Sequence, residues 1–269
     1  MPTTRPAAVA GMFYPGDGPG LQAEVGALLR GVLPQTPAAP PKALIVPHAG
    51  YVYSGPVAAS AYALLAPLRS QVHRVILLGP THRIAVRGLA LPECDAFATP
   101  LGSVRVDKAA AAAIAHLPQV IRHSATHAQE HSLEVQLPFL QEILEDFSVL
   151  PLAVGAASAG EVAEVLERLW DGPETLIVIS SDLSHYHPYP MARSLDQASA
   201  DCILDLDPVL DHEQACGATP INGLLMAARR HGLKPRLLDL RNSGDTAGDR
   251  GRVVGYAAFA FSEEDGHVR

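Results

Sequence analysis

Three short apolar runs in the sequence, 43–46, 75–78 and 176–179, each predict a β-strand that is buried on both faces. Soon after these runs come side chains that bind metals or transfer protons: His48, His82, Asp182 and His185. In an open parallel sheet the ligand crevice lies at the carboxyl ends of the strands, so we expect these side chains to converge. In the structural alternative, each histidine only bonds a carbonyl of its own loop. That alternative requires three histidines to follow three strands at one sheet edge by coincidence.

Two further segments add candidate groups. His131 and Glu134 are three residues apart, so at the start of a helix they would share a face; the alternative is a helix cap with an ordinary surface carboxylate. Cys216 lies in a loop next to Gly217, just before a predicted helix, where a thiol tends toward the thiolate. The alternative for Cys216 is a small buried hydrophobic residue.

Two histidines and one anionic ligand form a set that binds iron, copper or zinc and leaves positions for water, oxygen or substrate. A thiolate in that set favours copper and zinc relative to iron. Around such an ion, His131, Asp182 and His185 would shuttle protons or orient a substrate. A third interpretation makes Cys216 a nucleophile paired with a histidine.

Composition narrows the function classes. The chain has 269 residues, of which 48% are hydrophobic and 18% charged, which excludes wholesale disorder and suits one large domain. The net charge of −8 and the scattered basic residues exclude a broad nucleic-acid surface, and no apolar run approaches the ~18–20 residues that span a bilayer. Three cysteines without a CxxC pair and without an export signal indicate reduced thiols in the cytoplasm. No P-loop, dinucleotide fingerprint or GxSxG elbow is present.

The elements that must position these groups alternate along the chain. Helices are predicted at 21–32, 56–66, 107–117, 131–146 (kinked or split at Pro138), 158–170, 190–206 and 220–231. Further strands are predicted at 86–91, 147–154, 237–240 and 253–261, the last two antiparallel, and a surface loop at 34–41. This alternation predicts a single α/β domain over 1–269, with a central, largely parallel or mixed sheet flanked by helices.

Several stretches together carry a resemblance to a known family: AGMFYP at 10–15, PHAGYxYSG at 47–55, LGPxH at 78–82, EHSxExQLP at 130–138, SSDLSHY at 180–186, CG at 216–217 and NSGD at 242–245. They run nearly from end to end of the chain. On these motifs the sequence resembles the Memo family, known in bacteria and archaea as protein B of the AmmeMemoRadiSam system. The resemblance implies the LigB-like architecture of class III extradiol dioxygenases.

The resemblance also implies a site in which His48, His82 and Cys216 hold iron or copper, with zinc as a further option, beside Asp182 and His185. The dioxygenases use a carboxylate where this chain has Cys216, which argues against ring cleavage. We therefore expect a cytoplasmic metal-dependent redox or oxygenase-like enzyme acting on a small organic substrate. In it, His185 tuned by Asp182 is the acid/base, and His131 is a secondary contact.

The alternative expectation is a non-catalytic binding or scaffold protein on a degenerate dioxygenase fold. The resemblance implies a radical-SAM enzyme and an Ammecr-like protein as its partners. Neither nucleic acid nor a membrane is expected as a partner.

Overall fold

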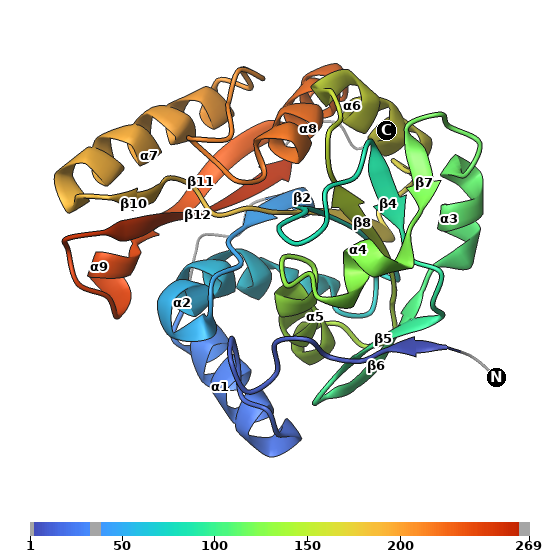
Figure 1. Cartoon of the computed structure of the whole chain (residues 1–269), viewed down its shortest axis with the longest axis horizontal. Helices are drawn as coiled ribbons and strands as arrows, with labels where there is room; N and C mark the ends of the chain where they lie inside the picture. The colour runs from blue at the N-terminus through green and yellow to red at the C-terminus, as the bar shows by residue number, and fades with distance from the viewer. Residues whose placement is uncertain (1–2, 33–38, 264–269) are drawn as a thin grey trace.

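The computed structural model describes residues 3–32 and 39–263, and in this part of the chain the strands form one mixed sheet covered by helices on both faces (Figure 1). The strands are β1 (Thr4–Arg5), β2 (Pro41–Val46), β3 (Arg74–Pro80), β4 (Leu89–Leu91), β5 (Ala96–Thr99), β6 (Gly102–Val106), β7 (Val120–Arg122), β8 (Ser148–Val154), β9 (Thr175–Ser180), β10 (His185–His187), β11 (Lys234–Asn242) and β12 (Val253–Ser262). The helices are α1 (Gly18–Arg30), α2 (Tyr51–Tyr62), α3 (Lys108–Ile114), α4 (Ser124–Ala128), α5 (Leu137–Ile143), α6 (Ala159–Arg168), α7 (Tyr189–Leu204), α8 (Ala218–Arg230) and α9 (Ser243–Thr246), with 3-10 turns at Ala63–Leu68 and Glu134–Gln136.

The centre of the sheet is parallel, in the order β8-β3-β9-β2. Ile179 of β9 lies between Ile45 of β2 and Leu78 of β3, so these strands end at the same level. Their residues are almost all buried, as continuous apolar runs predict. The loops that follow them therefore leave the sheet at one edge, which is the condition for the expected convergence of side chains.

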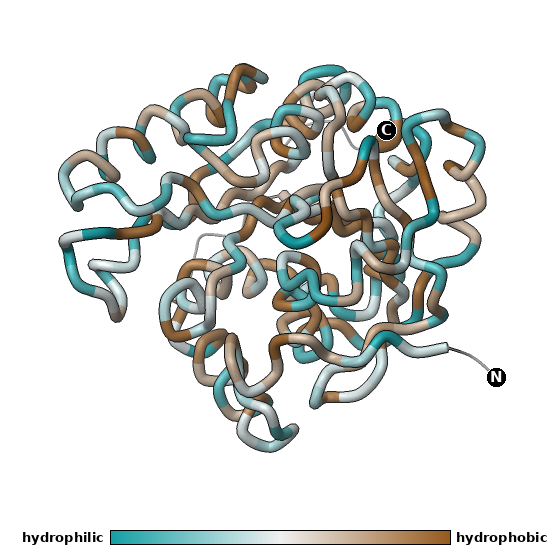
Figure 2. The backbone as a smooth tube through the Cα atoms, in the orientation of Figure 1, coloured by the Kyte–Doolittle hydropathy of each residue, from teal (hydrophilic) through white to brown (hydrophobic). Residues whose placement is uncertain are grey.

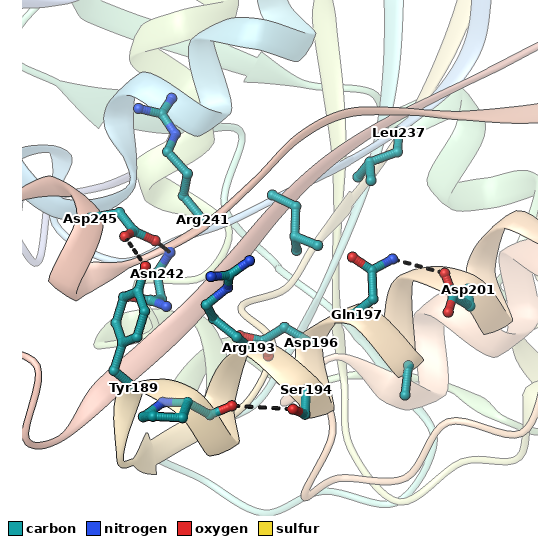
Figure 3. A pocket seen from close by; sticks show the side chains of 13 residues that line it. Tyr189, Arg193, Ser194, Asp196, Gln197, Asp201, Leu237, Arg241, Asn242 and Asp245 are labelled. Atoms are coloured by element: carbon teal, nitrogen blue, oxygen red, sulfur yellow. Dashed lines mark hydrogen bonds between the residues drawn. The ribbon is translucent and has the colours of Figure 1, made fainter.

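The two faces of the sheet carry separate hydrophobic layers. Helices α6, α7 and α8 cover one face, and α1, α2 and α5 cover the other (Figure 1). Figure 2 shows hydrophobic segments in the central strands and hydrophilic ones mainly in the outer loops. The fold class is therefore confirmed as an α/β domain with a mixed sheet flanked by helices. No helix in the described ranges is both long and apolar enough to cross a membrane.

The predicted elements differ from the observed ones in several places. The hairpin β5–β6 was not predicted, because its strands are short and alternate between buried and exposed residues. Helix α2 begins at Tyr51, so Pro56 lies inside it rather than at its start. The helix predicted at 131–146 is wrong at its beginning: a 3-10 turn precedes α5, and Pro138 lies in the first turn of α5, where its missing N–H costs nothing.

Other predictions are confirmed. Ser158 and Glu161 form the expected capping box of α6, and Asp107 caps α3. Strands β11 and β12 pair antiparallel. Most of the loop predicted at 34–41 lies outside the described residues, and β2 begins at Pro41.

Candidate metal centre

His48 is the second residue after β2 and is buried. Its backbone N–H donates to Oδ1 of Asp182 at 2.7 Å, and its ring Nδ1 lies 2.9 Å from Oγ of Ser180. Ser180 is the last residue of β9, the neighbour of β2 in the sheet, and Asp182 lies in the loop that follows it. Because Nδ1 is engaged by Ser180, the other ring nitrogen, Nε2, is the one that faces the centre of the site.

His82 and His131 are held by one carboxylate, that of the buried Glu130. Oε1 of Glu130 lies 2.9 Å from Nδ1 of His82 and 3.4 Å from Nδ1 of His131. The backbone N–H of His82 donates to Oε2 at 2.6 Å, and those of His131 and Ser132 donate to Oε1 at 2.9 and 3.0 Å. A carboxylate on the outer nitrogen of a histidine is the usual arrangement behind a metal-binding imidazole.

The three rings form what we call the histidine cluster: His48, His82 and His131. One nitrogen from each ring lies within 4.8 Å of the others. The ring centroids of His82 and His131 are 4.6 Å apart and nearly stacked, and the ring of Phe13 lies 4.8 Å from that of His131. The cluster therefore collects three imidazole donors at the sheet edge where the sequence predicted two.

Cys216 reaches His48 from the loop before α8. Its Sγ lies 3.3 Å from Nε2 of His48 and 3.6 Å from the carbonyl oxygen of Asp182, although it is outside the group of three nitrogens. Gly217 permits this approach, because a Cβ there would lie 2.7 Å from Cβ of Ser181. The structure thus brings Cys216 to His48 across 168 residues of chain.

The electrostatics of the site favour neutral imidazoles at His48 and His131. Burial lowers the pKa of His48 well below its usual value and that of His131 to about 4. Burial alone would raise the pKa of Glu130, but the hydrogen bonds from His82 outweigh it and bring that pKa to about 2. Neutral imidazoles backed by an ionised carboxylate are the form in which histidines bind metals.

The expectation that Cys216 tends toward the thiolate is wrong for the protein without an ion. Burial and, second to it, the carboxylate of Asp182 raise the pKa of its thiol to about 12. The location before a helix was predicted correctly, but the burial that overrides it was not visible in the sequence.

Asp182 bonds to the loop of His48 and not to His185, which was its expected partner. It is buried, and it bonds to the backbone of the His48 loop; within the described residues no hydrogen bond joins it to His185. Burial raises the pKa of Asp182 to about 7, against the N–H groups of His48 and Ala49, which lower it. The segment between Asp182 and His185 is not helical, and the expected tuning of His185 by Asp182 has no hydrogen bond behind it in the described residues.

His185 begins the short strand β10, which pairs with β12. Burial lowers the pKa of His185, and a hydrogen bond with the backbone of Leu183 offsets part of that shift. His185 therefore flanks the histidine cluster without belonging to it.

The carboxylate of Glu134 bonds to the N-terminal segment and not to His131, contrary to the predicted shared face. It is buried and paired with Arg5, and it accepts hydrogen bonds from Tyr14 at 2.5 Å and from the backbone of Val9 at 3.0 Å. Glu134 therefore anchors the N-terminal segment under the site. Glu134 is thus neither on a helix face shared with His131 nor a carboxylate at the surface.

Sequence reasoning missed two side chains that orient the ligands, Glu130 and Ser180. Glu130 was visible only as the residue before His131, and Ser180 only as the last residue of β9. Their roles arise from contacts across 48 and 132 residues, respectively, which no local spacing reveals.

Similarity to known proteins extends over nearly the whole chain. A family model described as a Memo-like protein matches residues 5–260. A MEMO1 family protein of Methanopyrus kandleri is 36% identical over 96% of this chain and 98% of its own. One of Aquifex aeolicus is 36% identical over the same shares. An uncharacterised protein of Escherichia coli K12 has a similar solved structure, with a TM-score of 0.52, 16% identity, and coverage of 81% of this chain and 98% of its own. That likeness supports the fold alone.

Proposed function

Because the chain belongs to the Memo-like protein family, we propose that it binds one transition-metal ion at the histidine cluster and acts as a metal-dependent redox or oxygenase-like enzyme on a small organic molecule. The observation that carries this proposal is the approach of three imidazole nitrogens to within 4.8 Å of one another at the carboxyl end of the sheet. Iron or copper would supply redox chemistry, and zinc would supply Lewis-acid chemistry only.

His48, His82 and Cys216 are the proposed ligands. Two ligands with bonds of ~2.0 and ~2.3 Å to one tetrahedral ion lie ~3.5 Å apart, close to the 3.3 Å between Nε2 of His48 and Sγ of Cys216. The third nitrogen of the cluster, from His131, either completes the ligand set or faces the position left open for substrate. The donor set therefore fits a borderline or soft ion.

His48, His82 and Cys216 would hold the ion, which would supply Lewis-acid or redox chemistry at the substrate. The residues beside it would then move protons. His131 is neutral and within the cluster, so it would accept a proton from a substrate hydroxyl. His185 flanks the cluster as a second proton carrier, and Asp182 would hold the His48 loop in place rather than act on substrate.

A non-catalytic scaffold is the second candidate function, and one observation favours it. Large hydrophobic side chains are exposed on the segments that carry site residues: Met12, Val52, Tyr53, Ile84 and Tyr186. Exposed apolar groups gathered around a site indicate a protein partner. The radical-SAM enzyme and the Ammecr-like protein implied by the family resemblance are the partners we propose, in the cytoplasm.

Metal binding tests the first proposal. The purified chain is dialysed against Fe(II) without oxygen, or against Cu(I), and the bound metal is measured. We expect one ion per chain in the wild type and loss of that ion in the His48→Ala/His82→Ala double variant. Substoichiometric metal in the wild type, or an unchanged content in the double variant, would contradict the site.

A binding experiment separates the enzyme from the scaffold. Capture of the radical-SAM partner is compared between the wild type, the His48→Ala/His82→Ala variant and a Tyr53→Ala/Tyr186→Ala variant. A Val209→Ala variant, altered at a side chain that is 60% exposed, is the control. Capture that ignores the histidines and fails only without the two tyrosines, together with no oxygen consumption, would favour the scaffold.

A further inference from the structure

A chain of buried hydrogen bonds leads from the core to His48. The hydroxyl of Tyr62 donates to Oε1 of Gln136 at 2.9 Å. The amide nitrogen of Gln136 donates to the carbonyl of Pro47 at 2.9 Å and to Oγ of Ser180 at 2.8 Å. A carbonyl oxygen can only accept, so the contact with Pro47 fixes which end of the Gln136 amide is the nitrogen. Gln136 is therefore a donor toward Ser180.

The single hydroxyl proton of Ser180 is used in a hydrogen bond to another residue. Its Oγ donates to the carbonyl oxygen of Ser132 at 2.6 Å, and that oxygen has no proton to return. Oγ accepts one proton from Gln136, which leaves it one remaining lone pair. The next partner of Oγ is Nδ1 of His48, at 2.9 Å. Only a protonated Nδ1 can fill that position.

From this proton count we infer that the relay Tyr62–Gln136–Ser180 holds His48 as the Nδ1–H tautomer, so that the lone pair of Nε2 is presented to the histidine cluster before any ion arrives. Ser180 and Gln136 are thus positioning residues that act through His48. The opposite tautomer would set two lone pairs against each other, or would turn the Ser180 hydroxyl away from Ser132 and leave a buried carbonyl without a donor.

The surroundings keep the relay intact. Tyr62, Gln136, Ser180 and Ser132 are each at most 1% exposed, so water does not compete for their protons. On the far side of the ring, the thiol of Cys216 lies 3.3 Å from Nε2. A thiol can donate a hydrogen bond, and an Nε2 without a proton can accept one at this distance. Both ring nitrogens therefore have a consistent partner in one tautomer.

Only the expected effect of the tautomer on metal affinity rests on the proposed function. A histidine must offer an unprotonated nitrogen to bind a metal, and an outer partner that fixes the tautomer raises affinity by 10–100-fold at typical sites. The tautomer itself is a property of the metal-free protein and can be measured without any ion.

The experiment is ¹⁵N NMR of the labelled, metal-free chain at neutral pH, with the His48 ring signals identified by their loss in His48→Gln. We expect Nδ1 of His48 at the shift of a protonated ring nitrogen and Nε2 at the shift of an unprotonated one. In Ser180→Ala we expect a mixture of the two tautomers and a 10–100-fold weaker affinity for Zn(II). The control is Ser184→Ala, a buried serine of the same loop with no hydrogen bond to His48 among the described residues.

An unprotonated Nδ1 in the wild type would overturn the inference, even if Ser180→Ala fails to fold. Wild-type shifts and wild-type Zn(II) affinity in a folded Ser180→Ala variant would overturn it as well. A wild type that binds no Zn(II) would refute the proposed function, whereas the shifts of His48 would still decide the tautomer.

Discussion

Replacing Glu130 with glutamine tests how the site holds its ligands. The carboxylate accepts the backbone N–H groups of His82, His131 and Ser132 and the ring N–H of His82, at 2.6 to 3.0 Å. Glutamine keeps the shape but loses the charge, and its NH₂ group must face one of these donors. The ring of His82 then loses the anion that fixes its orientation.

The expected magnitude follows from these contacts. The loss of one hydrogen bond to a buried charged group costs about 1.5–3 kcal/mol in the free energy of unfolding. Removal of the carboxylate behind a metal-binding imidazole weakens metal affinity by about 10–100-fold, or about 1.4–2.7 kcal/mol. Glu130→Gln should therefore lower both the stability of the metal-free protein and its affinity for metal.

The assay combines urea denaturation of the metal-free protein with Zn(II) titration of the folded protein. Glu134→Gln is the matched control, because Glu134 is equally buried but is held by Arg5 and Tyr14 instead of the histidines. It should lose stability and keep its metal affinity. A Glu130→Gln variant whose Zn(II) affinity stays within twofold of the wild type would refute the role of this carboxylate.

Three further predictions concern single side chains. Cys216→Ser should weaken Cu(I) binding by at least tenfold, measured by competition with a chelator, and equal affinity would remove the sulfur from the ligand set. Arg5→Met should lower the free energy of unfolding by about 3–5 kcal/mol in urea, because it leaves Glu134 buried without its ion pair, and a loss below about 1 kcal/mol would contradict that pairing. Burial raises the pKa of Asp196 to about 6, so the folded protein holds this proton more tightly than the unfolded chain does. The Asp196 carboxyl should therefore cost stability progressively as pH rises from about 4 to 6, by up to about 3 kcal/mol, and Asp196→Asn should remove that part of the pH dependence of unfolding. Parallel stability curves for the wild type and Asp196→Asn would show that the carboxyl is ionised without cost.

The fold was predictable because its central strands are continuous apolar runs that are buried on both faces. Such runs can be recognised in the sequence without knowing which strands lie beside them. Because the strands pair in parallel, their carboxyl ends meet at one edge of the sheet. The β5–β6 hairpin was not predictable in this way, because its short strands bury only alternate residues at the outer part of the sheet.

The candidate site was predictable only in part. His48 and His82 were marked by the strands before them, and Cys216 by its glycine-containing loop. His131 was selected for a spacing to Glu134 that the structure does not use, since Glu134 pairs with Arg5. The orienting contacts of Glu130 and of the Ser180 relay depend on tertiary proximity, as does the burial that keeps Cys216 a thiol. A single sequence contains no local signal for such contacts.

X-ray absorption at the zinc edge of the Zn(II)-loaded chain tests the central claim most directly. If His48, His82 and Cys216 share one ion, the spectrum should contain one sulfur at ~2.3 Å and at least two imidazole nitrogens at ~2.0–2.1 Å, and the sulfur should vanish in Cys216→Ser. A wild-type spectrum with nitrogen and oxygen neighbours alone, or a chain that takes up no stoichiometric zinc, would contradict the account.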